Sequence, residues 1–174
     1  MIKLLLVEDD ANLRYIIRGG LEDMIGGYEI KDAANGEEGL KVWQEWQPDV
    51  IVSDIEMPVM DGYEMVKRIR ETDPDTPILF SSGRVSPKDV VKGYELGVNN
   101  YVKKPFLPEE LDAHVHALLR MKQGTAEKSA AQQTFTRRNT GPENTGHGGR
   151  YLSNRKELYA GCRACYPETR IGYQ

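Results

Sequence analysis

Short apolar runs alternate with segments of helical period through the first 121 residues. Runs of this length, bounded by turn residues, are typical of strands that are buried on both faces of a parallel sheet. The expected strands are residues 2–7, 28–33, 50–54, 77–81 and 100–103. The run at 28–33 is the least apolar, so we expect it at an edge of the sheet.

After each run, apolar residues recur every three or four positions, which predicts five amphipathic helices. Their expected buried stripes are Leu13, Ile16, Ile17, Leu21 and Met24; Leu40, Trp43 and Trp46; Tyr63, Val66 and Ile69; Val90, Val91 and Tyr94; and Leu111, Val115, Leu118 and Leu119. A strand–helix unit repeated five times predicts a doubly wound α/β fold, with a five-stranded parallel sheet and helices on both faces.

Charge divides the chain into two parts. Residues 1–121 carry 14 Lys and Arg against 23 Asp and Glu, a net charge of −9, whereas residues 122–174 carry 9 against 4, a net charge of +5. The second part is polar and Gly-rich and has few large aliphatic side chains, which is typical of a linker or a disordered segment. We therefore expect a domain at 1–121 and a mostly irregular basic tail at 122–174.

Acidic residues follow two of the expected strands. Glu8 and Asp9 come directly after the first strand, and Asp54 ends the third. The carboxyl ends of parallel strands meet at one edge of the sheet, where open α/β sheets bind their ligands. Mg²⁺ relieves the repulsion between such carboxylates and keeps coordination sites for water and phosphate. We expect Asp9 and Asp54 as direct ligands, Glu8 acting through water, and the backbone carbonyl of Glu56 completing the shell.

Two further groups belong to the same edge. Ser82 follows the fourth strand, and Lys104 follows the fifth. With a metal bound, Asp54 is a carboxylate nucleophile that can accept a phosphoryl group. Phosphoryl transfer depends on positioning and on charge compensation, which a lysine ammonium and a hydroxyl donor can provide.

Four motifs in order resemble the receiver domain of two-component response regulators. They are Leu6-Val7-Glu8-Asp9-Asp10, Asp54-Ile55-Glu56-Met57-Pro58 with Asp61-Gly62, Pro77-Ile78-Leu79-Phe80-Ser81-Ser82-Gly83, and Tyr101-Val102-Lys103-Lys104-Pro105-Phe106. The resemblance covers about seven tenths of the chain, and it implies the flavodoxin-like receiver fold. It implies that Asp54 is the phosphoacceptor, that Glu8 and Asp9 are the acidic metal pair, and that Lys104 precedes a cis-proline.

The resemblance also implies a switch and its partners. Ser82 matches the switch hydroxyl, chosen over its neighbour Ser81 because it lies five residues after Pro77, and Tyr101 matches the aromatic residue that responds to it. The phosphoryl donor would be a histidine kinase or a phosphotransfer protein. The downstream protein target would bind the face formed by the fourth helix, fifth strand and fifth helix, and formation of a homodimer on phosphorylation is a further possibility.

We therefore expect a cytoplasmic signalling switch that phosphorylates and dephosphorylates itself without being an enzyme acting on an external substrate. Three alternatives stay open: a transcription regulator whose basic tail binds DNA, a truncated remnant of a longer regulator, and a hydrolase that releases phosphate rapidly. No stretch is long enough to cross a bilayer.

The tail contains Cys162 and Cys165, whose spacing is half of a zinc site. His147 is a possible third ligand, but the tail offers no clear fourth. Two reduced thiols are the simpler expectation. Nucleic-acid binding by the tail is disfavoured because it shows no helix-turn-helix pattern.

Overall fold

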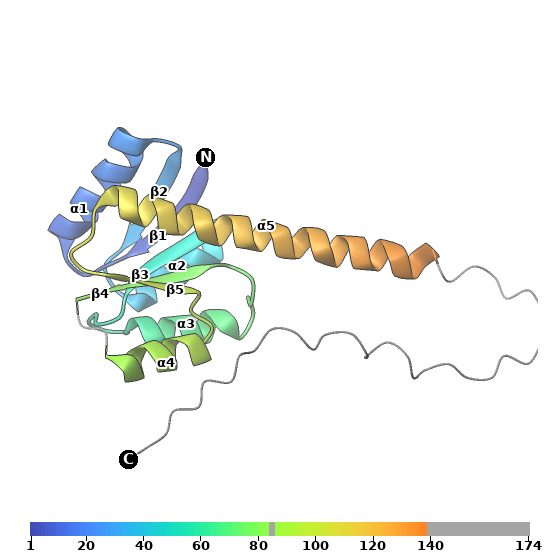
Figure 1. Cartoon of the computed structure of the whole chain (residues 1–174). Helices are drawn as coiled ribbons and strands as arrows, with labels where there is room; N and C mark the ends of the chain where they lie inside the picture. The colour runs from blue at the N-terminus through green and yellow to red at the C-terminus, as the bar shows by residue number, and fades with distance from the viewer. Residues whose placement is uncertain (84–85, 139–174) are drawn as a thin grey trace, which may run out of the picture. The chain divides into compact units, whose positions relative to one another are not determined.

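The expected doubly wound α/β fold is confirmed by a computed structural model, which describes residues 1–83 and 86–138 and, within 125–138, only the backbone. Five parallel strands form one sheet in the order β2-β1-β3-β4-β5, so β2 lies at an edge as expected (Figure 1). The strands are β1 (Ile2–Val7), β2 (Tyr28–Ala33), β3 (Val50–Asp54), β4 (Ile78–Ser82) and β5 (Asn100–Lys103).

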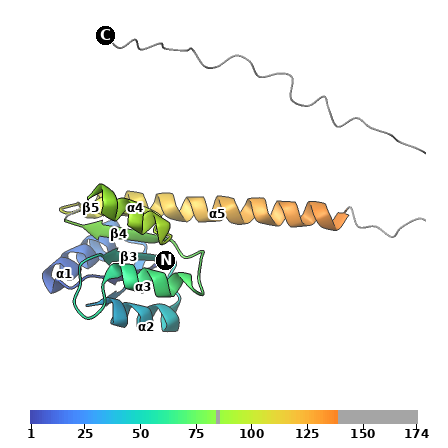
Figure 2. The ribbon, with the colours of Figure 1, turned by 90° about the horizontal axis from the view of Figure 1, so that it is seen from below.

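The helices cover both faces of this sheet. They are α1 (Ala11–Gly19), continued by a π-helical segment η1 (Gly20–Ile25), then α2 (Gly36–Trp46), α3 (Gly62–Arg70), α4 (Pro87–Glu95) and α5 (Pro108–Arg138). Helices α1 and α5 lie on one face and α2, α3 and α4 on the other, as the two views show (Figures 1 and 2).

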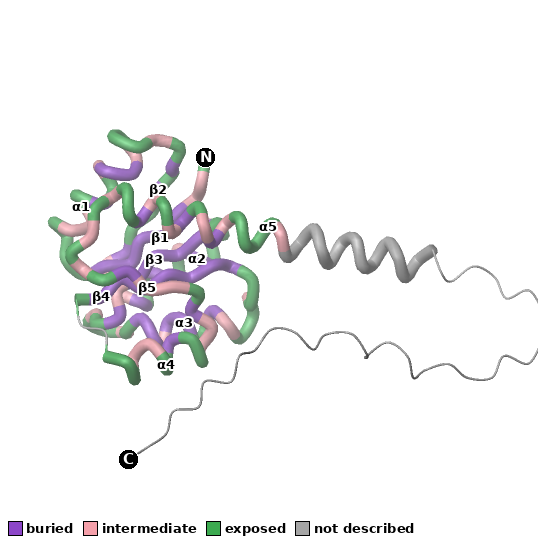
Figure 3. Tube along the Cα trace, in the orientation of Figure 1, coloured by how far each residue is buried: buried purple, intermediate pink, exposed green. Residues whose placement is uncertain are grey.

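Side-chain alternation along the strands produces two separate cores. Leu4, Leu6, Val50, Val52 and Leu79 pack against buried residues of α1 and α5. Their neighbours along the chain point to the other face and pack against α2 and α3. The central strands are consequently buried along nearly their whole length (Figure 3). Because side chains two residues apart on a strand point to the same face, the face of each residue at a strand's carboxyl end follows from the residues before it.

Side-chain caps set the starts of the helices. Asp10 begins α1 by accepting hydrogen bonds from the backbone N–H groups of Asn12 (2.8 Å) and Leu13 (3.2 Å). Asp61 begins α3 in the same way, and Ser86 begins α4 with a reciprocal capping box to Asp89. Because Asp10 and Asp61 each follow a strand closely, these caps also fix the loops that carry the acidic residues.

The predicted stripes are correct for α3 and largely correct for α5, but partly wrong for α1 and α4. Ile16 and Met24 are 60% and 78% exposed, and Val91 and Tyr94 are 58% and 50% exposed. Periodicity identified the helices, yet the apolar arc in α1 and α4 is wider than the part that the sheet covers.

Two close contacts in these helices involve glycines. A Cβ on Gly20 would overlap the Pro108 ring, and one on Gly93 would overlap the Tyr101 hydroxyl.

Helix α5 passes the boundary predicted at residues 121–122 and continues to Arg138. At 1.5 Å per residue its 31 residues extend about 46 Å. Gly124 alone does not end it, because one glycine costs only about 1 kcal/mol in a helix and its neighbours are good helix formers. Among residues 1–83 and 86–138, no helix is long and apolar enough to cross a bilayer.

Candidate functional site

The three carboxylates predicted from the sequence lie together at the carboxyl edge of the sheet. One oxygen from each of Glu8, Asp9 and Asp54 lies within 4.8 Å of the others. Glu8 is buried, Asp54 is half-buried and Asp9 is exposed. Three hard oxygen donors at this spacing suit Mg²⁺, which takes one or two carboxylates and keeps several waters. The residues present therefore fit a magnesium ion.

Lys104 lies between two of these carboxylates. Its Nζ donates to Asp54 Oδ2 at 2.5 Å and to Glu8 Oε2 at 2.6 Å. Burial works against the charge on Lys104, but the hydrogen bonds that its ammonium donates to Asp54 and Glu8 outweigh this effect, so the pKa of Lys104 is raised. Burial raises the pKa of Glu8, and its bond to Lys104 offsets only part of that effect. The peptide bond between Lys104 and Pro105 is cis, as the resemblance implied.

The loop after β3 holds Asp54 at the edge of the site. Asp54 Oδ1 accepts a hydrogen bond from the backbone N–H of Ile55 at 2.6 Å. Gly62 N–H donates to the Ile55 carbonyl at 2.9 Å, and a Cβ on Gly62 would overlap the backbone carbonyl oxygen of Asp54. Only a residue without a side chain allows α3 to begin this close to the strand end. Asp54 is thereby held at the strand tip from both sides.

Between Asp54 and α3 the chain makes a strained turn. Val59 has φ of 68°, and Met60 N–H donates to the Pro58 carbonyl at 2.7 Å, which closes a three-residue turn around Val59. Positive φ is a true outlier for a β-branched residue. Such strain is often found next to functional sites.

Arg14 is a member of the site that the sequence did not reveal. Its Nη1 donates to the backbone carbonyls of Glu8 (2.5 Å) and Asp9 (3.1 Å), and its Nε donates to Asp32 Oδ2 (3.2 Å). The guanidinium therefore fixes the backbone of both predicted metal residues. In the sequence, Arg14 is an ordinary polar position of a helix, so no pattern distinguishes it.

The two consecutive serines at the end of β4 lie on opposite faces of the sheet. Ser82 follows Phe80 by two residues and belongs to the face of Tyr101, whereas Ser81 follows Leu79 and belongs to the face of Asp54. Both are buried. Among the described residues, Ser81 Oγ has no hydrogen-bond partner. An unpaired buried hydroxyl costs about 1–3 kcal/mol.

Tyr101 lies half-buried against α4. Its hydroxyl donates to the Asp89 carbonyl at 3.1 Å, and its ring packs edge-on against Phe80 and Tyr94 at centroid distances of 5.6 and 5.5 Å. Burial raises the pKa of Tyr101. Tyr63 donates to the same carbonyl at 3.2 Å. The predicted aromatic switch residue is therefore tied to α4 together with a second tyrosine that the sequence analysis placed only in the core.

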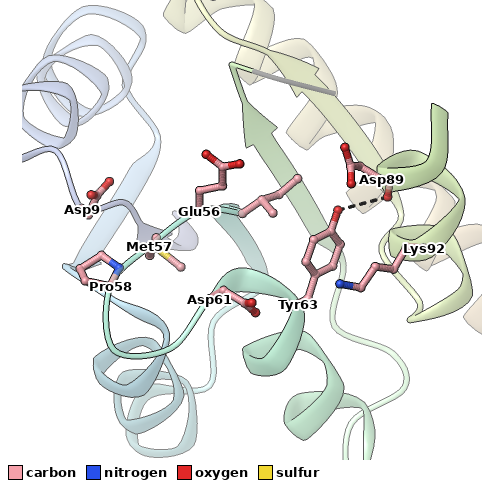
Figure 4. A pocket seen from close by; sticks show the side chains of 9 residues that line it. Asp9, Glu56, Met57, Pro58, Asp61, Tyr63, Asp89 and Lys92 are labelled. Carbon is pink, nitrogen blue, oxygen red and sulfur yellow. Dashed lines mark hydrogen bonds between the residues drawn. The ribbon is translucent and has the colours of Figure 1, made fainter. Parts of the chain in front are cut away.

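An open cleft leads from the acidic cluster to α4 (Figure 4). Its volume is about 390 Å³, and its lining residues are Asp9, Ile55, Glu56, Met57, Pro58, Asp61, Tyr63, Asp89 and Lys92. The Lys92 ammonium lies 3.8 Å from the centre of the Tyr63 ring. One end of the cleft is formed by Asp9 of the acidic cluster and by Ile55 and Glu56, the two residues that follow Asp54. The predicted tail residues His147, Cys162 and Cys165 lie outside the described residues.

The chain resembles known proteins over the same region. The family model of the response regulator receiver domain matches residues 4–116. Transcriptional regulatory protein PrrA of Mycobacterium leprae is 41% identical over 128 residues, which are 74% of this chain and 54% of that protein. Probable transcriptional regulator ycf27 of Guillardia theta is 42% identical over 118 residues, 68% of this chain and 45% of that protein. The chain thus spans about half the length of these relatives.

The solved structure of the chemotaxis protein CheY4 from Vibrio cholerae has a TM-score of 0.64 and 38% identity, and it covers 68% of this chain and 98% of that one. The family match extends from β1 into α5, and it includes the acidic cluster, Ser82 and Lys104. The chain therefore belongs to the response regulator receiver family of two-component signalling.

Proposed function

We propose that Asp54 accepts a phosphoryl group from the phosphohistidine of a histidine kinase or phosphotransfer protein, in a Mg²⁺-dependent step. The observation that carries the proposal is the position of Asp54. Its carboxylate accepts a hydrogen bond from the Lys104 ammonium at 2.5 Å, and one of its oxygens lies within 4.8 Å of oxygens of Glu8 and Asp9, which could share a metal ion with it. With Mg²⁺ bound to the three carboxylates, an acceptor oxygen of Asp54 would have positive charge nearby from both the metal ion and Lys104.

The chemistry is a displacement at phosphorus. An Asp54 carboxylate oxygen forms a bond to phosphorus while the bond from phosphorus to the donor histidine nitrogen breaks, and that nitrogen keeps the electron pair. Lys104 exchanges a carboxylate oxygen for a phosphoryl oxygen and offsets its charge. Asp9 and Asp54, with Glu8 through water and the Glu56 carbonyl, would hold Mg²⁺, which would supply further positive charge when bound.

The proposed output follows from the elements around the cleft. Ser82 donates its hydroxyl to the phosphoryl group, and Tyr101 responds by repacking against α4. The surface formed by α4, β5 and α5 then binds a downstream protein or a second copy of the chain. The phosphoryl group leaves by slow hydrolysis, so the chain does not turn over an external substrate. The cytoplasmic location expected from the sequence is part of this proposal.

The names of the curated relatives raise DNA binding as an output. PrrA and ycf27 are called transcriptional regulators, but their alignments with this chain cover 128 and 118 residues and about half of each relative. The shared part is the receiver domain, which gives no support to DNA binding by residues 122–174.

The test is to trap the phosphorylated residue. The full chain is incubated with phosphoramidate and Mg²⁺, reduced with borohydride, which converts an aspartyl phosphate to homoserine, and mapped by peptide mass spectrometry. We expect homoserine at position 54 alone. Homoserine at Asp9 or Asp61, with none at position 54, would contradict the proposal.

A further inference from the structure

Ser81 is a polar residue that neither the proposed chemistry nor the core explains. Its side chain is fully buried, and among the described residues its Oγ has no hydrogen-bond partner. Buried hydroxyl groups in proteins are nearly always paired, so an exception needs a specific explanation. Ser53, a second buried serine nearby, is paired in the ordinary way, since its Oγ donates to the Asp54 carbonyl at 2.7 Å.

The sheet register places Ser81 in the row of the acceptor. Ser81 on β4 pairs with Asp54 on β3 and with Val102 on β5. Asp54 follows Val52 by two residues and Lys104 follows Val102 by two, and both valines belong to the core on the α1 and α5 face. By the same alternation Ser81, which follows Leu79, lies on this face. Asp54, Ser81 and Lys104 therefore share one face at the carboxyl ends of three adjacent strands.

The hydrogen bonds of Lys104 show where its side chain runs. Lys104 begins at the end of β5, but its ammonium bonds Asp54 on β3, and β4 lies between these two strands. Two strand spacings are about 10 Å, so the lysine must extend across the end of β4 on the face that holds Ser81. The hydroxyl of Ser81 thus lies beneath the path of this side chain.

We propose that Ser81 is a positioning residue for Lys104. A lysine ammonium has three hydrogen-bond donors, and in this structure two of them bond Glu8 and Asp54. When Glu8 and Asp54 bind a metal ion and Asp54 carries a phosphoryl group, the Lys104 ammonium would bond a phosphoryl oxygen. It would then lose its hydrogen bonds to the two carboxylates. The Ser81 hydroxyl then accepts a hydrogen bond from the ammonium and holds it above β4. The inference rests on the proposed function.

The test compares Ser81→Ala with the matched variant Ser53→Ala in the full chain. Thermal unfolding is followed with Mg²⁺ alone and with Mg²⁺ plus beryllofluoride, which imitates a phosphoryl group on a carboxylate. We expect Ser81→Ala to raise the unfolding midpoint in Mg²⁺ alone, because an unpaired hydroxyl is removed, and to weaken beryllofluoride binding about tenfold. Ser53→Ala loses a bond present in both states, so we expect it to lower both midpoints by similar amounts.

A second measurement separates positioning from a general effect on packing. In the beryllofluoride complex, the exchange of the Lys104 Nζ protons with water is followed by NMR. We expect this exchange to be several times faster in Ser81→Ala than in wild type, and unchanged in Ser53→Ala.

Three results would overturn the inference: a lower resting midpoint for Ser81→Ala, beryllofluoride affinity within twofold of wild type, or unchanged exchange at Lys104. A wild-type chain that does not respond to beryllofluoride would refute the proposed function, and the inference with it.

Discussion

Replacing Gly93 by alanine tests the packing of Tyr101 on α4. Alanine is normally better than glycine inside a helix by about 1 kcal/mol. At this position, however, the new Cβ would overlap the Tyr101 hydroxyl and lie 2.7 Å from its Cζ atom. The phenol is the free end of a side chain, so we expect it to rotate out of contact with α4 and not to displace the helix.

The magnitude follows from the contacts that Tyr101 would lose. Its hydrogen bond to the Asp89 carbonyl is worth about 1 kcal/mol, and its edge-on contacts with Phe80 and Tyr94 are worth about 0.5–1.5 kcal/mol each. After the helical gain is subtracted, Gly93→Ala is expected to lower the free energy of unfolding by about 1–3 kcal/mol. In a Tyr101→Ala background nothing opposes the new methyl group, so the same substitution is expected to stabilise the chain by about 1 kcal/mol.

The assay is urea unfolding of the four proteins of this cycle, followed by circular dichroism. The reversal of sign between the two backgrounds is the decisive result. If Gly93→Ala stabilises the wild-type chain as much as it stabilises the Tyr101→Ala variant, Tyr101 does not pack on Gly93 and the reasoning is refuted.

Three further predictions concern the frame of the site. Val59→Gly relieves the positive φ and is expected to stabilise the chain by about 1 kcal/mol in urea unfolding; a loss of stability would argue against the strained turn. Gly20→Ala is expected to cost about 1–3 kcal/mol because its Cβ meets the Pro108 ring, whereas Gly19→Ala, whose Cβ would make only an ordinary contact with Asp23 Oδ2 at 3.8 Å, is expected to be neutral or stabilising; equal effects would contradict the close contact. The pKa of Lys104 is raised above 10.5, so its stabilising effect is present below that pH and is lost as the pH rises through the higher folded value. The free energy of unfolding of the wild-type chain is therefore expected to fall above that pH, and that of Lys104→Met is expected to fall less. If the free energies of the two proteins fall in parallel with pH, Lys104 is not the group responsible.

Much of the fold follows from local pattern. The structure places all five strands within one residue of the predicted bounds. Helices bury both faces of the central strands β1, β3 and β4, so the sequences of these strands have little freedom. Surface helices are less constrained. Ile16 and Val91 continue an apolar stripe but lie beyond the arc that the sheet covers, and helical period alone does not show where that arc ends.

Some residues of the candidate site could be predicted from the sequence and others could not. Glu8, Asp9, Asp54 and Lys104 were predictable because parallel strands bring their carboxyl ends to one edge. Arg14, Tyr63 and Ser81 were not predicted as site residues. Tyr63 on α3 reaches the site through its bond to the Asp89 carbonyl on α4, 26 residues away, and Arg14 through bonds to the carbonyls of Glu8 and Asp9, which no residue pattern marks. Nothing local in the sequence records such contacts.

The central claim is that Asp54 accepts a phosphoryl group with the help of Mg²⁺. The most direct test is the intact mass of the full chain after incubation with acetyl phosphate, with Mg²⁺ and with EDTA, for wild type and Asp54→Ala. We expect the mass of one phosphoryl group to be added to the wild-type chain only when Mg²⁺ is present, and nothing to be added to Asp54→Ala. The same addition to Asp54→Ala, or an addition to wild type that does not depend on Mg²⁺, would contradict the account.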